Sequence, residues 1–352
     1  MFQQSDLSIL CCPACKVSLQ LANAHLECTR CHAQFPIIND IPRLLYFGDG
    51  NSNYNNAWDY KWTHLDAGKG YNYRILDESD PAYAIHNVWR YNEYDGAAFV
   101  DIQNGIAIDV GCGIGQYSVN LLRKGARRVY AIDLTKGVDI GRRIFLARYP
   151  ELAAKIVFIQ ANARYLPLKT SSIDVGMALA SLHHTGYLEA CMQELVRVVK
   201  ETNRFFVWIY SKPLFPIGCE TRSVKGLFNL IKFIGMHLHV EIAYTILKHL
   251  PNAALCLVLR FFASDFIYAL LRIPIIGSLF KIICLQGINK HPDHGYRFIN
   301  LYDAYAPSFS EGSDESDVIT WADKFHFKIL RFSPWRLGFL AQKENMESSA
   351  FH

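Results

Sequence analysis

The stretch Ile106–Gly115, which reads IAIDVGCGIG, constrains the fold of this chain more than any other. An apolar run typical of a strand leads directly into three glycines at alternate positions, and a helix-like segment follows. Glycine lets the backbone turn sharply and approach a ligand closely, and the first N–H groups of the following helix point at the same place. We therefore expect a nucleotide-like cofactor on this turn.

A carboxylate at the end of a second expected strand supports this interpretation. Residues 127–133, RRVYAID, read as a short strand that ends in Asp133. An acidic residue at about this distance from a glycine-rich turn holds ribose hydroxyls in nucleotide-binding folds. A dinucleotide is disfavoured, because a G-x-G-x-x-G frame requires Gly or Ala where this chain has Gln116.

The turn resembles the first motif, D-x-G-x-G-x-G, of the class I S-adenosylmethionine (SAM)-dependent methyltransferases. Residues 159–168, IQANARYLPL, resemble the third landmark of that family, with Asn162 where the family has an acidic residue that contacts the adenine amino group. An amide oxygen can still accept a hydrogen bond from adenine. Residues 172–184, SIDVGMALASLHH, resemble the fourth strand and its loop in the form typical of ubiquinone-type and related small-molecule methyltransferases.

The resemblance implies a cofactor site and a set of catalytic candidates. Asp133 would hold the ribose, and Asp109 would help to fix the turn around the methionine end. The implied cofactor-binding residues are Asp109, Gly111, Cys112, Gly113, Gly115, Asp133, Leu134, Ala161, Asn162, Ala163 and Ala180. His183 and His184 follow the fourth strand and are candidates for a general base. A packing role for each histidine remains the alternative.

Two C-x-x-C pairs near the start of the chain predict a metal site. Cys12 and Cys15 are separated from Cys28 and Cys31 by twelve residues, a spacing that can place four thiolates around one tetrahedral Zn²⁺. Ten cysteines and no expected secretory signal favour a reducing compartment over disulfides. Four cysteines leave no open coordination position, so the zinc is expected to be structural. The weaker candidate ligands are Cys11, His25 and His32.

The residues that flank these cysteines resemble the small zinc ribbons that include the Trm112-type methyltransferase activators. In that family the ribbon is structural and often docks on a methyltransferase. Further along, the segment WDYKW at 58–62 resembles an F-G-x-Q-W segment found ahead of related methyltransferase cores. Its aromatic residues, with Tyr71, Tyr73, Trp89, Tyr91 and Tyr94, are expected to cover the cofactor or to pack a helical cap.

A strongly apolar stretch from 224 to 290 is interrupted by charged residues and broken by Pro274. A helix that spans a membrane needs about 20 predominantly apolar residues, so we expect a helical lid rather than a spanning segment. A helix lying in a membrane interface is the alternative. Beyond this insertion, 313–325 is expected to be a helix, and 327–332 and 336–342 the last two strands.

The expected architecture is an α/β fold with a Rossmann-like, seven-stranded, mostly parallel sheet and helices on both faces. The expected parts are a zinc ribbon (1–46), a linker and aromatic cap (47–104), a SAM-binding core (105–212), an apolar lid (213–298), a segment that completes the sheet (299–343) and a tail (344–352).

The predicted function is SAM-dependent methyl transfer to oxygen or carbon of a small or lipid-like metabolite in the cytoplasm, with peripheral membrane contact as an option. Two alternatives stay open: an RNA base methyltransferase, and a non-catalytic ribbon partner with a degenerate methyltransferase fold. The net charge of +4 in 352 residues, without runs of Lys or Arg, neither demands nor excludes RNA. Binding of the cofactor would separate the enzyme from the scaffold.

Overall fold

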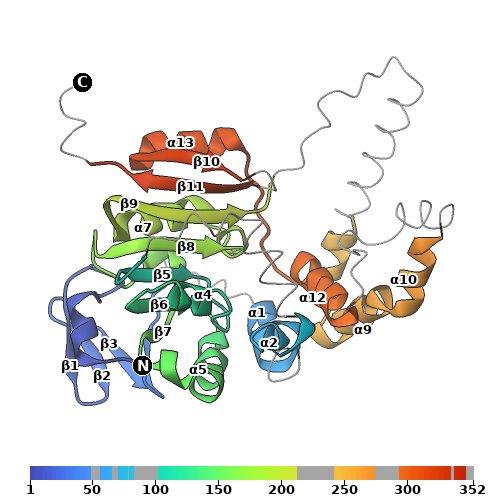
Figure 1. Ribbon diagram of the computed structural model, residues 1–352, viewed down its shortest axis with the longest axis horizontal. Helices are drawn as coiled ribbons and strands as arrows, with labels where there is room; N and C mark the ends of the chain where they lie inside the picture. The colour runs from blue at the N-terminus through green and yellow to red at the C-terminus, as the bar shows by residue number, and fades with distance from the viewer. Residues whose placement is uncertain are drawn as a thin grey trace. The chain divides into compact units, whose positions relative to one another are not determined.

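A computed structural model of the chain provides the fold (Figure 1). It describes residues 1–48, 56–65, 70–77, 79–82, 102–211, 242–273, 293–333 and 337–345. Most of the expected linker, the end of the expected tail and the aromatic residues Trp89, Tyr91 and Tyr94 lie outside these ranges. The chain forms two compact units, and each is described by itself. Unit 1 comprises Met1–Tyr54, Lys61–Lys212 and Phe309–His352, and unit 2 comprises Asn55–Tyr60 and Pro213–Ser308. The domain boundaries expected from the sequence stay predictions.

Unit 1 is built on a sheet of eleven strands in the described residues, in the order β1-β2-β3-β4-β7-β6-β5-β8-β9-β11-β10 (Figure 1). The strands are β1 (Leu19–Ala22), β2 (His25–Cys28), β3 (Gln34–Ile38), β4 (Ile41–Leu44), β5 (Ile106–Val110), β6 (Arg128–Asp133), β7 (Ile156–Ala161), β8 (Ile173–Leu179), β9 (Val199–Ile209), β10 (Phe327–Phe332) and β11 (Leu337–Lys343). From β4 to β9 all neighbours are parallel, whereas β11 runs antiparallel to both β9 and β10. The predicted α/β fold class, with a mostly parallel sheet, is confirmed.

Helices cover both faces of this sheet, because successive apolar side chains of its strands point to opposite faces. On β5, Ile106, Ile108 and Val110 face one hydrophobic cluster, and Ala107 faces the other. The first cluster includes side chains of α7 and α13, and the second includes side chains of α4 and α5. Because successive side chains of a strand point to opposite faces, nearly continuous apolar strands are the expected pattern for a sheet buried on both sides.

The helical segments of unit 1 are mostly short. They are η1 (Gln4–Ser8), η2 (Lys61–Leu65), α2 (Tyr71–Arg74), α4 (Ser118–Arg123), α5 (Gly137–Arg148), α6 (Pro150–Ala153), η5 (Ala163–Tyr165), η6 (Leu182–His184), α7 (Leu188–Val198) and α13 (Glu315–Phe325). Helix α13 illustrates local control by the sequence: Asp314 accepts from the backbone N–H groups of Ser316 and Asp317, and His326 ends the helix in the left-handed conformation.

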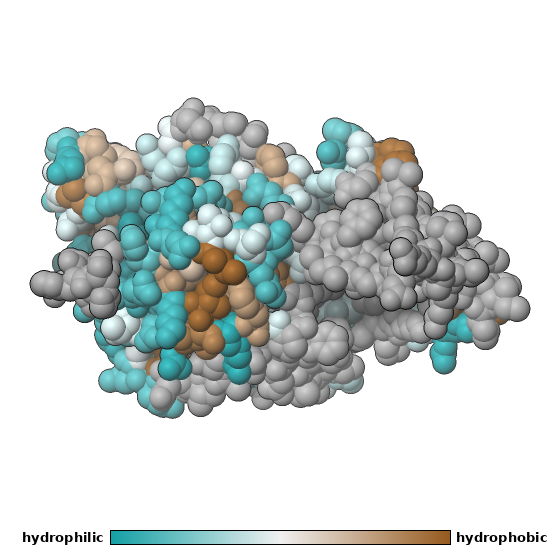
Figure 2. Space-filling model, turned by 90° about the horizontal axis from the view of Figure 1, so that it is seen from above, coloured by the Kyte–Doolittle hydropathy of each residue, from teal (hydrophilic) through white to brown (hydrophobic). Residues whose placement is uncertain are grey.

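Helix α13 and the last two strands lie where the sequence predicts them. At this end of the sheet the surface carries an apolar patch ringed by hydrophilic residues, over α13 and β10 (Figure 2). Ile319 on α13 is 51% exposed, and Leu330 on the edge strand β10 is 36% exposed.

The amino-terminal residues extend the sheet. Strands β1 to β4 form an antiparallel ribbon, and β4 then pairs in parallel with β7, with Arg43 opposite Gln160 and Leu44 opposite Ala161. The Arg43 guanidinium also donates to both carboxylate oxygens of Asp139 at the start of α5, at 2.9 and 2.5 Å. The ribbon therefore covers the edge that a seven-stranded sheet would expose at β7.

A buried carboxylate fastens the start of the chain to the same region. Asp6, which is 3% exposed, accepts from the Arg128 guanidinium at 2.9 and 2.5 Å and from the Tyr130 hydroxyl at 2.9 Å. It also accepts from the backbone N–H of Gln3 at 2.7 Å. This carboxylate therefore satisfies several donors that have little access to water.

Unit 2 is helical in its described residues. Its named helices are α1 (Asn56–Tyr60), α9 (Asn252–Ala263), α10 (Asp265–Arg272) and α12 (His294–Tyr305), and residues 242–247 are also helical. Within the unit, the Tyr302 hydroxyl donates to the Ala57 carbonyl at 3.0 Å. By length and composition, Asn252–Arg272 is a candidate membrane span. However, Ser264 is extended, with φ −61° and ψ 155°, and it divides this run into α9 and α10.

We predict that Asp6→Ala destabilises the folded chain by about 3–5 kcal/mol, because it leaves the Arg128 side chain, which is 12% exposed, without its carboxylate and Tyr130 without its acceptor. Glu189→Ala is the matched control. Glu189 pairs with Lys324, but its side chain is 50% exposed, so its loss should cost less than about 1 kcal/mol. Denaturant unfolding of both variants measures the difference, and equal effects would contradict the anchoring role of Asp6.

Candidate functional site

The predicted cofactor residues follow the carboxyl ends of four parallel strands. Asp109 lies near the end of β5, Asp133 and Ala161 end β6 and β7, and Ala180 follows β8. Because the strands are parallel, these ends share one edge of the sheet. Strand order reverses at β5, which lies between β6 and β8, and ligands of open α/β sheets bind at such a switch point. The structure thus brings the predicted residues to one place.

The glycine turn after β5 needs its glycines. Gly111, Gly113 and Gly115 have φ values of +75°, +56° and +83°. A Cβ on Gly113 would lie 2.5 Å from the indole ring of Trp62, and a Cβ on Gly111 would overlap the side chain of Ser181. A side chain at either position would therefore be strained by its backbone angle and by its neighbour. Trp62, on η2, packs on this turn and is 7% exposed.

Two hydrogen bonds from the turn fix it to the neighbouring strand. The N–H groups of Gly111 and Cys112 donate to the Ile132 carbonyl at 2.7 and 3.0 Å. Cys112 itself is buried, at 3% exposed. On the other side, the Ser181 hydroxyl donates to the Val110 carbonyl at 2.7 Å. The turn is thereby held between the ends of β6 and β8.

Asp133 is held in place by the turn and by the residues that follow it. Its Oδ2 accepts from the Gly113 N–H at 2.8 Å, and its Oδ1 accepts from the N–H and hydroxyl of Thr135 at 2.8 and 2.6 Å. Three donors of the chain thus hold this carboxylate beside the glycine turn. Together with the glycine turn, this acid fits a ribose-bearing cofactor. The role of Thr135 was missed from the sequence, although an Asp-x-Thr turn is a local signal for it.

Asp109 lies beneath the turn in a different environment. It is 1% exposed, and its Oδ2 accepts from the Ser118 hydroxyl at 2.7 Å. Burial, and to a smaller extent the nearby charge of Asp133, raise the pKa of Asp109 to about 7, although the hydrogen bond from Ser118 lowers it. This carboxyl therefore joins β5 to the start of α4 and gains little from being ionised.

The remaining predicted cofactor residues surround this edge. The Leu134 carbonyl accepts from the Gln160 side chain at 3.0 Å, and Ala161 is buried opposite Leu44 of the ribbon. Ala163 begins η5 directly after Asn162. Ala180 adopts a φ of +53°, which is unfavourable for a residue with a Cβ, and its N–H donates to the Trp208 carbonyl.

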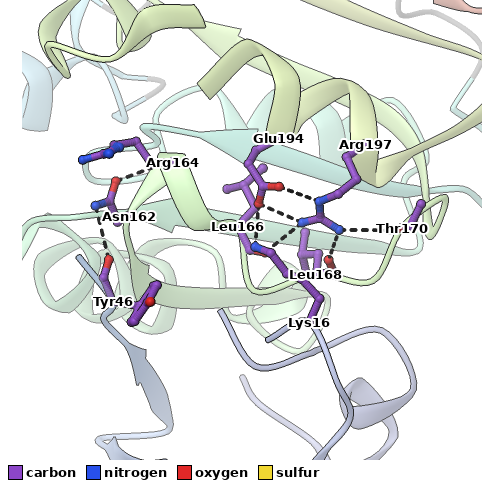
Figure 3. A network of polar contacts seen from close by, with 9 residues as sticks. All are labelled: Lys16, Tyr46, Asn162, Arg164, Leu166, Leu168, Thr170, Glu194 and Arg197. Carbon is purple, nitrogen blue, oxygen red and sulfur yellow. Dashed lines mark hydrogen bonds and ion pairs between the residues drawn. The ribbon is translucent and has the colours of Figure 1, made fainter. Parts of the chain in front are cut away.

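Asn162 has a structural reason for being an amide. Its Oδ1 accepts from the Arg164 N–H at 3.0 Å and caps η5, while its Nδ2 donates to the Tyr46 carbonyl at 3.3 Å (Figure 3). An aspartate here would direct a carboxylate oxygen at that carbonyl. Oδ1 keeps a second lone pair, which is the position from which it would accept the adenine amino group. The amide that replaces the family's acid thus contacts Tyr46, which lies just after β4.

The ribbon also supports the loop that follows Asn162. Lys16, next to Cys15, donates from Nζ to Glu194 at 2.7 Å and to the Leu166 carbonyl at 3.2 Å (Figure 3). Arg197 donates to the same carboxylate and to the carbonyls of Leu166 and Leu168. These contacts tie the loop at 166–168 to both the ribbon and α7.

Backbone contacts add to this support. The Cys11 N–H donates to the Pro167 carbonyl, and the Lys169 N–H donates to the Ile9 carbonyl, each at 2.9 Å. Cys11 and Lys16 flank the first C-x-x-C pair. Folding of that pair is thus coupled to the position of the loop beside the predicted adenine site.

The four predicted zinc ligands come together in the ribbon. The Sγ atoms of Cys12, Cys15, Cys28 and Cys31 all lie within 4.8 Å of one another, with separations of 3.3 Å for Cys15 and Cys28 and 3.7 Å for Cys12 and Cys31. A tetrahedral site with Zn–S bonds of about 2.3 Å places its sulfurs about 3.8 Å apart, so the donor set fits Zn²⁺.

The backbone around the second pair stabilises a thiolate. The N–H groups of Arg30 and Cys31 each lie 3.4 Å from the Cys28 Sγ. Burial opposes ionisation, but these backbone hydrogen bonds, together with those from the thiols of Cys15 and Cys31, outweigh it and lower the pKa of Cys28 to about 6. The weaker candidates Cys11, His25 and His32 lie outside the group of four.

Comparison with known proteins agrees with the geometry at the sheet edge. A family model described as a methyltransferase domain matches residues 108–207. The chain contains a class I SAM-dependent methyltransferase domain. It is 24% identical over 136 residues to the ubiquinone/menaquinone biosynthesis C-methyltransferase UbiE of Bartonella bacilliformis, which covers 38% of this chain and 52% of the relative.

Two further proteins are similar to the methyltransferase domain. The sterol 4-C-methyltransferase strm-1 of Caenorhabditis elegans is 29% identical over 106 residues, 30% of this chain and 31% of the relative. A SAM-dependent methyltransferase of Mesorhizobium loti has a solved structure with 20% identity and a TM-score of 0.28, covering 32% of this chain and 52% of that one. The chain spans about half or less of the length of these curated relatives.

The two candidate histidines of the methyltransferase domain lie on η6, directly after β8, and differ in their surroundings. His183 is fully buried and stacks on Tyr210, with ring centroids 3.9 Å apart. His184 is 8% exposed, and its Nδ1 lies 3.0 Å from the Phe309 carbonyl. A carbonyl only accepts, so this bond requires a proton on Nδ1 and leaves the lone pair of a neutral ring on Nε2.

We predict one zinc ion per chain. Cys15→Ser and Cys28→Ser should each lower the zinc content and destabilise the ribbon, because metal-binding free energy contributes to its folding. Cys191→Ser is the control, since Cys191 is buried on α7 away from the four ligands. Elemental analysis and thermal unfolding of the three variants test this. Full zinc content in Cys28→Ser would contradict it.

A second prediction follows from the raised pKa of Asp109. Between pH 3.8, the usual pKa of an aspartic acid, and about pH 7, Asp109 keeps its proton in the folded chain but has released it in the unfolded chain. The contribution of this group to stability is therefore complete below about pH 4 and is lost as the pH rises to 7, by roughly 4 kcal/mol in total.

Asp109→Asn removes this titration and keeps an acceptor for Ser118. As the pH rises from about 4 to 7, the free energy of unfolding of the parent should therefore fall relative to that of the variant. Denaturant unfolding at several pH values measures this difference. A difference that does not change with pH would show that Asp109 does not titrate in this window.

Proposed function

We propose that this chain is a SAM-dependent methyltransferase that methylates oxygen or carbon of a small, lipid-like metabolite. The observation that carries the proposal is the glycine turn joined to Asp133, where Gly113 donates to the acid that would receive the ribose hydroxyls. The names of the relatives point to carbon acceptors in apolar molecules, a quinone and a sterol. The apolar insertion of this chain is consistent with an acceptor of that class.

The residues at the sheet edge have distinct roles in this proposal. Bound SAM supplies a methyl group on a positively charged sulfur. The glycine turn gives the backbone room to approach it, Asp133 binds the ribose hydroxyls, and Asn162 accepts from the adenine amino group. Alignment of the acceptor with the sulfur–methyl bond supplies much of the rate enhancement, since transfer is an in-line displacement.

His184 is the better placed of the two proposed bases. With its proton on Nδ1, it would accept at Nε2 the proton that a hydroxyl or an acidic carbon loses as the new bond to the methyl group forms. His183, buried against Tyr210, would position this loop. Both roles are proposals that follow from the packing on η6.

Calorimetry of SAM and of its demethylated product with zinc-loaded protein tests the cofactor site. We expect micromolar binding by the parent, and loss of that binding in Asp133→Ala. Asp174→Ala is the matched control, because Asp174 accepts from the N–H of Ile106, the first residue of β5, whereas the glycine turn follows the last residue of that strand. Absence of binding by the zinc-loaded parent would overturn the proposal and favour the scaffold protein.

Transfer of a labelled methyl group from SAM into a lipid and quinone extract tests the acceptor class. His184→Gln should keep the SAM affinity of the parent and reduce transfer by about 10²-fold, which separates the base from the cofactor site. Label that enters RNA instead of the extract would overturn the acceptor class.

A further inference from the structure

Unit 2 exposes large apolar side chains on its helices. On α9, Leu257 and Phe261 are 73% and 57% exposed, and on α10, Phe266 is 65% exposed. Ile242 and Ile246, in the helical residues 242–247, are 52% and 60% exposed. Scattered apolar residues on a surface are ordinary, but large ones gathered on consecutive helices indicate an interaction site.

The exposed residues of α9 and α10 form faces distinct from those that pack inside the unit. Leu257 and Phe261 are four residues apart, so they lie on one side of α9, while Leu255 and Leu259 are buried. On α10, Phe266 is exposed, while Ile267 and Leu271 are buried. Each helix thus packs some apolar side chains inside unit 2 and exposes others on its surface.

Cations accompany these apolar residues. Arg260 and Arg272 are exposed, and their guanidinium groups lie 4.8 Å and 5.6 Å from the ring centroids of Phe298 and Tyr268. The exposed acid of α10, Asp265, is paired at 2.5 Å with the buried Arg297. The basic side chains of these two helices are therefore left to interact with an external anion.

The net charge of unit 2 is also positive. Unit 2, residues 55–60 and 213–308, holds nine Lys and Arg against six Asp and Glu, a net charge of +3, which is most of the +4 of the whole chain. Two copies of such a segment repel each other, but an anionic surface attracts it. Charge therefore favours a lipid surface over a second copy of this chain as the occupant of the apolar faces.

The break at Ser264 sets the geometry of this contact. Helix α9 has twelve residues, and at 1.5 Å per residue it is about 18 Å long, shorter than the roughly 30 Å of a bilayer's apolar core. The Ser264 hydroxyl accepts from the Ile267 N–H and starts α10 as a new helix. Two short helices with exposed aromatic, aliphatic and arginine side chains suit the interface of a membrane.

We propose that unit 2 docks on an anionic membrane surface through the exposed apolar residues Leu257, Phe261 and Phe266, with Arg260 and Arg272 beside lipid headgroups. Docking of this kind needs neither the cofactor nor an acceptor, so it stands apart from the proposed methyl transfer. It would place the enzyme where lipid-like molecules are concentrated.

Co-sedimentation of the zinc-loaded chain with vesicles tests this proposal. We expect binding to phosphatidylcholine vesicles that contain phosphatidylglycerol, and much weaker binding to phosphatidylcholine alone. A triple variant, Leu257→Ser with Phe261→Ser and Phe266→Ser, should lose at least roughly tenfold in affinity, and Arg260→Glu with Arg272→Glu should do the same. Ile319→Ser with Leu330→Ser, exposed apolar residues of unit 1, is the matched control and should bind like the parent.

The outcomes are separable from the fate of the proposed function. Failure of the parent to bind anionic vesicles, or equal binding by the triple variant, overturns the docking surface. A change in mass by light scattering in the triple variant, without vesicle binding by the parent, would assign the apolar faces to a second copy. Calorimetry with SAM on the same samples reports whether unit 1 is folded and binds cofactor, independently of the vesicles.

Discussion

The parallel pairing of β4 with β7 is the interaction on which the arrangement of unit 1 depends. It joins a small ribbon, whose own core is too limited to stand without its cysteines, to the edge of a large buried sheet. The pairing brings Arg43 to Asp139 and places Tyr46 beside Asn162. Elsewhere the ribbon contacts Leu166 through Lys16. The cluster of four cysteines and the predicted cofactor-binding edge thus belong to elements that are connected by short, direct contacts.

This connection gives the predicted zinc a consequence beyond the ribbon. The loop at 166–168 accepts hydrogen bonds from residues on both sides of the first C-x-x-C pair. If the ribbon unfolds, the Pro167 carbonyl loses its donor, the Leu166 carbonyl keeps only Arg197, and Asn162 loses the acceptor of its amide. The predicted adenine side of the methyltransferase domain would then be less ordered before it binds cofactor, and ordering it would weaken the measured affinity.

The sequence was sufficient for the parts of the site that depend on local backbone chemistry. Alternating glycines after an apolar run, and an acid at the end of the next strand, are visible as patterns because they act within a few residues of their own position. The last helix and two strands were also predictable, since Asp314 and the alternation in β10 and β11 are local. The fold class followed from the order of these elements.

Other features depend on partners that are far apart in the chain, and no local pattern announces them. Asp6 meets Arg128 across more than a hundred residues, and Trp62 packs on Gly113 from a separate segment. The choice between two adjacent histidines depends on the Phe309 carbonyl, which only the fold brings near. The sequence predicted a sheet of seven strands and missed the continuation to eleven, because a ribbon strand and a domain-edge strand look alike in sequence.

The register of β4 on β7 involves only two residue pairs, Arg43 with Gln160 and Leu44 with Ala161. On its own, so short a ladder would form weakly between separate chains. Here both strands belong to one polypeptide, so the ribbon meets its edge at an effective concentration in the millimolar range or above, if the connecting segment can span the distance. Covalent fusion therefore replaces an assembly equilibrium, and the stoichiometry of ribbon to domain is fixed at synthesis.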